Sequence, residues 1–128
     1  MIVKIYMLTL LLHIIDDFVL QPICLSKLKQ KSWWEENAPD SLYRYDYIVA
    51  LVEHAFSWTF MIMLPITIKM IVDNNILTTY WCIAFIVNLC IHAIVDHLKA
   101  NDKKINLIID QTIHICQIII TWLYMPNM

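Results

Sequence analysis

The sequence predicts an all-α fold: an integral membrane four-helix bundle with a polar core of histidine and aspartate. Of the 128 residues, 60% are hydrophobic and only 16% are charged, which is too little polar material to cover a soluble domain of this size. Four segments are apolar enough and long enough to span a bilayer, which takes roughly 20 helical residues. The chain has no glycine, and this disfavours the tight hairpin turns of β-sheet proteins.

The four helices are expected at about residues 2–21, 47–72, 77–98 and 105–124, in a single domain covering residues 1–128. Residues 22–46 form the one long polar loop, and Pro65 is expected to kink the second helix. Seven of the nine basic residues flank one side of the bundle: Lys27, Lys29, Lys31, Arg44, Lys99, Lys103 and Lys104. The positive-inside rule therefore places the loop 22–46 in the cytoplasm and both termini outside it, in an inner or plasma membrane.

Composition also excludes several functions. Without glycine the chain cannot contain a Walker loop or a dinucleotide fingerprint. A net charge of −2 gives no basic face for nucleic acid, so the expected partner is the lipid bilayer and no nucleic acid is expected. The four cysteines have no C-x-x-C spacing and are expected to be reduced side chains within apolar segments.

Charged and polar residues recur at regular spacing inside the apolar helices. A charge near the bilayer centre costs on the order of 3 kcal/mol, so such residues persist only when buried in protein and partnered. Three helices each carry a histidine and an aspartate at i, i+4, which puts both side chains on one helix face. The second helix adds a single histidine. The pairs are His13 with Asp17, His92 with Asp96, and Asp110 with His114, and the lone histidine is His54.

The depth of these residues predicts that they form two layers. Counted inward from the cytoplasmic end of each helix, all four histidines lie seven to nine residues deep, which is roughly 10 to 14 Å at the helical rise. The three aspartates lie roughly 4 to 8 Å deep by the same arithmetic. Four antiparallel helices would thus bring a ring of imidazoles next to a ring of carboxylates.

Imidazole and carboxylate together are the usual ligands of zinc, manganese and iron. The sequence therefore predicts a buried centre with one or two divalent metal ions, zinc first, with manganese and iron as alternatives. The candidate ligands are His13, Asp17, His54, His92, Asp96, Asp110 and His114. Two other interpretations stay open: a purely structural hydrogen-bonded network, and a path for protons or ions. Stacked haems would need histidine pairs at two depths, whereas these histidines share one.

Three further residues flank the predicted centre. Gln21 and Gln111 are placed to orient ligands from outside the coordination shell. Lys99 lies on the same side as His92 and Asp96, where its ammonium group could hold an anionic group such as phosphate.

These motifs resemble those of a known family. The pattern is His13-x-x-x-Asp17-Phe18-x-Leu20-Gln21, then His54, then His92-x-x-x-Asp96-x-x-Lys99, then Asp110-Gln111-x-x-His114. It is similar to the signature of a family of small bacterial and phage membrane proteins, the domain-of-unknown-function family numbered 3307. The resemblance implies four membrane helices and no established activity. A looser similarity connects the pattern with membrane-bound metal-dependent hydrolases.

The function expected from the residues is a membrane-embedded metal-dependent hydrolase that acts on a phosphate ester or a lipid headgroup at the cytoplasmic face. Asp17, Asp96 and Asp110 are the candidate catalytic residues, because an aspartate not bound to metal can act as general base. The alternative is a non-catalytic bacterial or phage membrane protein whose His/Asp network is structural or conducts protons or ions. A phosphate-containing small molecule or lipid is the expected ligand in the first case only.

Overall fold

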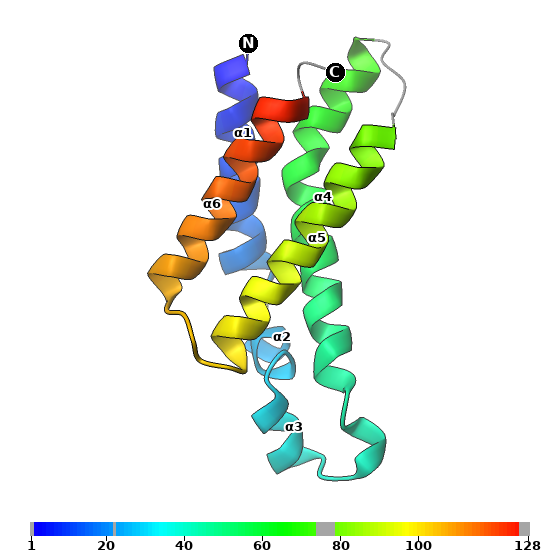
Figure 1. Ribbon diagram of the computed structural model, residues 1–128, viewed down its shortest axis with the longest axis vertical. Helices are drawn as coiled ribbons and strands as arrows, with labels where there is room; N and C mark the ends of the chain where they lie inside the picture. Colours follow the sequence, from blue (N-terminus) through cyan, green and yellow to red (C-terminus); the bar gives the residue numbers. More distant parts are fainter. Residues whose placement is uncertain (1, 22, 74–78, 126–128) are drawn as a thin grey trace.

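The computed structural model describes residues 2–21, 23–73 and 79–125, and every regular element in these ranges is helical (Figure 1). Six are α-helices. In chain order the elements are α1 (Ile2–Ile15), the π-helix η1 (Asp16–Leu20), α2 (Ile23–Leu28), α3 (Lys31–Asn37), the 3-10 helix η2 (Ser41–Tyr43), α4 (Asp46–Val72), α5 (Thr79–Ala100) and α6 (Leu107–Tyr124).

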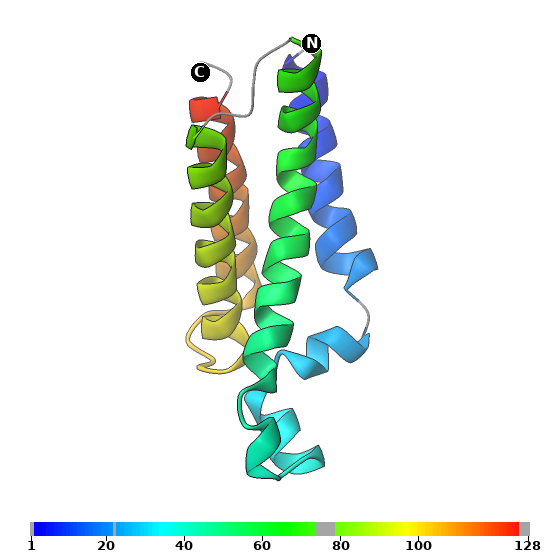
Figure 2. The same cartoon turned by 90° about the vertical axis from the view of Figure 1, so that its right-hand side faces the viewer.

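The all-α prediction is confirmed, but the prediction of four helices is wrong, because the described residues contain six α-helices. The four long ones, α1, α4, α5 and α6, run side by side with alternating directions (Figures 1 and 2). α4 contacts α1 and α5, and α6 contacts α5 and α1, so the four form a closed ring. The two additional helices, α2 and α3, lie in the predicted loop 22–46 and extend beyond one end of the ring.

Within the described residues, three helices are long and apolar enough to cross a membrane. They lie in the segments Ser41–Val72, Thr79–Ala100 and Leu107–Tyr124, of which the last two coincide with α5 and α6. The first predicted span along the chain, residues 2–21, is not a single α-helix: α1 has only 14 residues and ends at Ile15. The predicted start of the third span at residues 77–78 lies outside the described residues.

The backbone continues beyond α1 as the π-helix η1, in which Gln21 N donates to Asp16 O, a bond from residue i+5 to residue i. A π-turn is wider than an α-turn and is found mostly where function demands it. Here it lets two consecutive residues face the bundle: Asp16 is 1% exposed, and the side chain of Asp17 is 8% exposed. In a regular α-helix these side chains would diverge by about 100°.

The segment between α2 and α3 packs over the end of the bundle. Asn101, just after α5, holds it with two hydrogen bonds: its Nδ2 donates to Lys29 O at 3.0 Å, and its Oδ1 accepts from Lys31 N at 2.7 Å. The carbonyl of Lys29, just after α2, and the N–H of Lys31, the first residue of α3, are satisfied in this way. As a result Lys29, a loop lysine, is only 5% exposed.

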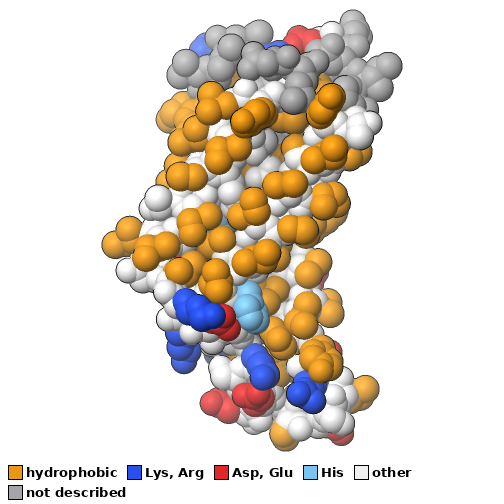
Figure 3. Space-filling view, in the orientation of Figure 1, with side chains coloured by type: hydrophobic (Ala, Val, Ile, Leu, Met, Phe, Trp, Pro, Cys, Tyr) orange, Lys and Arg blue, Asp and Glu red, His pale blue; other side chains and the backbone are white. Residues whose placement is uncertain are grey.

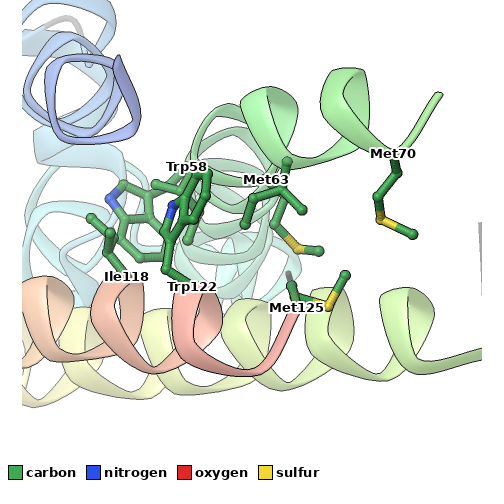
Figure 4. Packing of buried hydrophobic residues seen from close by; sticks show 8 residues of the cluster. Trp58, Met63, Met70, Ile118, Trp122 and Met125 are labelled. Carbon is green, nitrogen blue, oxygen red and sulfur yellow. The ribbon is translucent and has the colours of Figure 1, made fainter. Parts of the chain in front are cut away.

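The bundle divides into an apolar half and a polar half. The apolar half is a buried cluster of large side chains from α4 and α6 with Met125, and Trp58 forms its boundary with the polar half (Figure 4). The indole N–H of Trp122 donates to Thr9 Oγ1 at 3.1 Å, so this buried donor is satisfied. On the face shown in Figure 3, apolar side chains cover much of the bundle, and charged side chains gather at the end where α2 and α3 lie.

The turn from α5 to α6 is built without glycine. Lys103 takes the left-handed conformation with φ 53°, which glycine would adopt at lower cost. Beside it, a hydrogen bond from Lys104 holds the pKa of Asp102 below its ordinary value. This exposed pair lies outside the group of buried histidines and aspartates.

Candidate metal centre

Four imidazoles from the four long helices meet in the polar half of the bundle, as their matching depth predicted. His13 comes from α1, His54 from α4, His92 from α5 and His114 from α6, and all four are buried. The ring centroids of His92 and His114 are 4.1 Å apart, those of His54 and His92 are 5.0 Å apart, and those of His13 and His114 are 6.2 Å apart. The four rings therefore form one contiguous group.

Carboxylates from three elements surround these rings. His114 Nε2 lies 3.4 Å from Asp110 Oδ1 and 3.7 Å from Asp96 Oδ1. His54 Nε2 lies 3.4 Å from Asp17 Oδ1 and 3.6 Å from Asp96 Oδ2. Asp96 thus lies between the two histidines and offers one oxygen to each.

Two sets of side chains among the described residues can hold a metal ion. One is Asp17, His54 and His92, and the other is His92, Asp96 and His114. In each set the three candidate ligand atoms lie within 4.8 Å of one another. His13 and Asp110, both predicted as ligands, belong to neither set, although both contact members of them.

Hydrogen bonds fix which nitrogen of His114 carries a lone pair. Gln117 donates through Nε2 to Asn88 O, so its Oε1 is free to accept, and it lies 3.1 Å from His114 Nδ1. The neutral His114 ring then donates from Nδ1 and keeps its lone pair on Nε2. That lone pair faces the oxygens of Asp96 and Asp110.

This arrangement brings electron-rich atoms together in a dry interior. His114 Nε2, Asp110 Oδ1 and both ring nitrogens of His92 are buried and have no hydrogen-bond partner. His114 Nε2 lies 3.4 Å from Asp110 Oδ1 and 3.7 Å from Asp96 Oδ1, and His92 Nε2 lies 4.0 Å from Asp96 Oδ1. All three distances exceed the 2.7–3.2 Å of N–H···O bonds. Ligand atoms around a tetrahedral zinc ion lie about 3.3 Å apart, given bonds of about 2.0–2.1 Å. The observed spacing is therefore close to that of a ligand shell.

Trp58 shapes the opposite side of the group. Its indole N–H donates to His13 Nδ1 at 2.8 Å, and its ring stacks on His92 with centroids 4.2 Å apart. Because Trp58 occupies Nδ1, a neutral His13 carries its proton on Nε2. His13 can then donate a hydrogen bond to the group but has no lone pair left for a metal.

Two lysines approach the carboxylates from the end where α2 and α3 lie. Lys29 Nζ forms a salt bridge with Asp96 Oδ2, and Lys99 Nζ forms one with Asp110 Oδ2. In both aspartates the other oxygen, Oδ1, faces His114. Each carboxylate therefore connects a lysine on one side with an imidazole on the other.

The two predicted glutamines contact the same layer. Gln111 Nε2 donates to Asp17 Oδ2 at 2.8 Å and to Asp110 Oδ2 at 3.1 Å. The amide of Gln21 satisfies both of its neighbours when its nitrogen donates to Asp17 O and its oxygen accepts from Lys29 Nζ. Both glutamines thus orient groups next to the candidate ligands.

A cavity of about 180 Å³ connects this cluster with the end of the bundle. Its lining includes Asp17, His54 and Asp96 from the ligand sets, together with Lys99 and Gln111. The side chain of Lys99 is 32% exposed, whereas that of Asp110 is fully buried. Lys99 is therefore the lysine that an incoming molecule can reach.

A family model for proteins of unknown function, DUF3307, matches residues 5–128, a range that includes every member of the cluster. The chain belongs to the DUF3307 family. The resemblance drawn from the His, Asp and Gln motifs is thereby confirmed. Comparison with curated proteins found no match, and neither did comparison with solved structures.

In this DUF3307 chain the sequence motifs include most of the residues of the cluster. Three residues that contact it, Lys29, Asp16 and Trp58, are not among the motif positions. Lys29 lies in a loop whose spacing carries no helical pattern, and Asp16 reaches the cluster only through the π-turn. Trp58 follows His54 by four residues and so shares its helix face, which is a signal that could have found it. Asp16 Oδ1 accepts from Ser57 Oγ at 2.6 Å, and Asp16 Oδ2 lies 3.7 Å from His54 Nδ1.

Proposed function

We propose that this protein is an integral membrane, metal-dependent hydrolase whose ion lies between His92, Asp96 and His114. The observation that carries the proposal is the group of buried ring nitrogens and carboxylate oxygens that lie 3.4 to 3.7 Å apart, several of them without a hydrogen-bond partner. A cation among these atoms would satisfy the buried nitrogen and oxygen atoms together. Asp110 Oδ1, at 3.4 Å from His114 Nε2, is a further ligand candidate in the same place.

Charge supports a divalent ion. Four carboxylates, those of Asp16, Asp17, Asp96 and Asp110, contribute four negative charges, and Lys29 and Lys99 contribute two positive ones. One divalent cation makes the cluster neutral when all its histidines are neutral. Zinc suits this mixed nitrogen and oxygen set, and manganese or iron would also accept it.

A bound divalent ion supplies Lewis acidity and lowers the pKa of a coordinated water. The protein's own groups would do the rest. Asp17 lines the cavity and is outside the set of His92, Asp96 and His114, so its carboxylate can accept the proton of a water there. Gln111 keeps Asp17 in place, and His13 can donate to developing negative charge through Nε2–H.

The substrate proposed is a phosphate ester or a lipid headgroup that enters from the cytoplasmic face. The cavity lies at the end of the bundle where α2, α3 and most of the basic side chains lie. Lys99 lines it as a fixed positive charge that can bind an anionic oxygen. The positive-inside rule places this end in the cytoplasm and the chain termini on the other side.

The orientation gives a first prediction. In a variant whose native cysteines are replaced, Met128→Cys should react in intact cells with a thiol reagent that cannot cross the membrane. A cysteine at Asn37, in the region 22–46, should react only after the cells are lysed. The reverse labelling pattern would show that the orientation is wrong and that the cavity opens to the outside.

Lys99 gives a second prediction. Lys99→Ala should keep its metal, because an ammonium group cannot ligate a cation, but should lose about 10- to 100-fold in activity on a phosphate ester, the value of a charge-assisted hydrogen bond. Metal content and phosphate release are measured on the same sample. Lys104→Ala, which removes an exposed lysine at the same end, is the control and should keep both. Loss of metal from Lys99→Ala would assign this lysine to the structural network.

Metal analysis and phosphate release test the proposal as a whole. Protein purified in detergent should contain at least one equivalent of zinc, manganese or iron, and chelation should abolish release of phosphate from phosphatidic acid or a soluble phosphate monoester. Adding the ion back should restore the activity. A fully folded protein that neither contains nor takes up such an ion would overturn the proposal.

A second candidate function rests on the interhelical bonds themselves. The salt bridges of Lys29 and Lys99 and the bonds Trp58 to His13 and Ser57 to Asp16 connect helices whose outer faces are apolar. Such a network can serve a non-catalytic membrane protein. The polar contacts also continue from His114 through Gln117 and Asn88 to Thr121, a direction that a proton path could follow. A metal-free folded protein would favour this candidate.

A further inference from the structure

We propose that the cluster holds two divalent ions and that His92 connects them; this inference rests on the proposed function and extends it. The first ion has the ligands His92, Asp96 and His114, and the second has Asp17, His54 and His92. The two sets share His92 and no other residue. Two ions can therefore bind together only if the imidazole ring of His92 ligates both of them.

The surroundings of His92 favour a shared ring. His92 is 0% exposed, and neither ring nitrogen has a hydrogen-bond partner. A neutral imidazole always presents one N–H and one lone pair, so one ion would satisfy the lone pair and leave a buried donor unsatisfied. An unsatisfied buried polar group costs about 1–3 kcal/mol. Two ions, one at each nitrogen, satisfy both after the ring loses its N–H proton to solvent.

The surroundings of His54 favour the second ion. Asp16 Oδ2 is buried without a hydrogen-bond partner and lies 3.7 Å from His54 Nδ1. A carboxylate beside one imidazole nitrogen favours the proton on that nitrogen and leaves the other free for a metal. The other nitrogen, Nε2, lies 3.4 Å from Asp17 Oδ1, which is again close to the spacing of ligands around one ion. Ser57 holds Asp16 in this position through its other oxygen.

The net charge of the cluster allows two divalent ions if an anionic substrate binds with them. With one divalent ion the cluster is neutral, so a second adds two positive charges. The deprotonated ring of His92 cancels one of them. An anionic substrate can cancel the other. The cavity that such a substrate would enter is lined by Asp96 from the first set and by Asp17 and His54 from the second.

A pair of ions narrows the chemical class of the substrate. Each divalent ion beside the cavity could act as a Lewis acid toward a phosphoryl oxygen of a phosphate ester. Together with Lys99 in the cavity lining, this points to a phosphate ester, whether on a lipid or on a soluble molecule, in preference to an uncharged acyl ester. Parallel assays with phosphatidic acid vesicles and a soluble phosphate monoester distinguish the two sources of the phosphate group.

The number of bound ions tests the inference separately from the function. Detergent-purified protein is stripped with chelator, titrated with Zn²⁺ and analysed for bound metal. The wild type should bind two equivalents, and Asp17→Asn, which keeps the side-chain shape but weakens the second set, should bind one. Asp102→Asn, which changes an exposed carboxylate outside the cluster, should still bind two. Mn²⁺-loaded wild type should also show the magnetic coupling of neighbouring ions, and Asp17→Asn should not.

Each result of the metal titration bears on a different part of the proposal. One equivalent in the folded wild type overturns the second ion and leaves the proposed function in place. No bound metal in the folded wild type overturns both. Two equivalents in Asp17→Asn would overturn the assignment of Asp17 to the second ion. Should Asp17→Asn fail to fold, His54→Gln tests the same set and is expected to bind one equivalent.

Discussion

Replacing His114 with alanine is expected to remove the metal and with it the activity. In a neutral His114 the hydrogen bond with Gln117 leaves the lone pair on Nε2, which lies 3.4 and 3.7 Å from two carboxylate oxygens. Loss of a residue that merely orients a ligand costs 10- to 100-fold in metal affinity. Loss of the ligand itself should therefore cost more than about 100-fold, and purified His114→Ala should contain almost no metal.

His97 provides the control for this experiment. It is a histidine of α5 whose side chain is 37% exposed, and it contacts Asp102 and Tyr47 outside the cluster. His97→Ala should keep both metal and activity. Circular dichroism and elution as a single species in detergent confirm that His114→Ala is folded. If a folded His114→Ala retains its metal at wild-type affinity, the set of His92, Asp96 and His114 is not the metal site.

Helical spacing and depth were enough to predict that the histidines meet. The i, i+4 spacing fixes a helix face, and the rise per residue fixes a depth, so His13, His54, His92 and His114 could be placed in one layer without coordinates. In the structure their rings do form one group. The same reasoning could not divide the cluster into ligands and supports, because that depends on contacts such as Trp58 to His13, which no spacing encodes.

Departures from regular structure were not predictable in the same way. The π-turn at Asp16 follows no proline or glycine, and it arises where two adjacent aspartates both find partners in the bundle. The helices α2 and α3 could not be predicted within the loop 22–46, because six and seven residues are too few to show a helical period. Lys29 was read only as one of the basic residues that set the orientation, since its burial depends on Asn101, a residue far away in the sequence.

The burial of Lys29 leads to the second large effect. Lys29→Met is expected to destabilise the protein by about 3–5 kcal/mol, because it leaves the carboxylate of Asp96 buried without its cation. The side chains of this pair are only 6% and 3% exposed, so water cannot replace the lost ammonium group. The loss is a large part of the 5–15 kcal/mol that stabilises a typical domain. Lys27→Met, at an exposed position of α2, should have almost no effect on thermal unfolding in detergent.

A double variant separates the structural role of this pair from metal binding. Lys29→Met combined with Asp96→Leu removes both charges, and replacing a buried ion pair by apolar side chains is often neutral or stabilising. The double variant should therefore regain most of the lost stability, yet it should bind less metal, because Asp96 is a proposed ligand.

Lys29→Met alone should keep its metal in the folded fraction, since the substitution takes a repelling positive charge away from the ion. Wild-type stability of Lys29→Met would show that the salt bridge with Asp96 does not hold the α2–α3 segment on the bundle. Full metal content in the stable double variant would remove Asp96 from the ligands and leave its contact with Lys29 as a structural one.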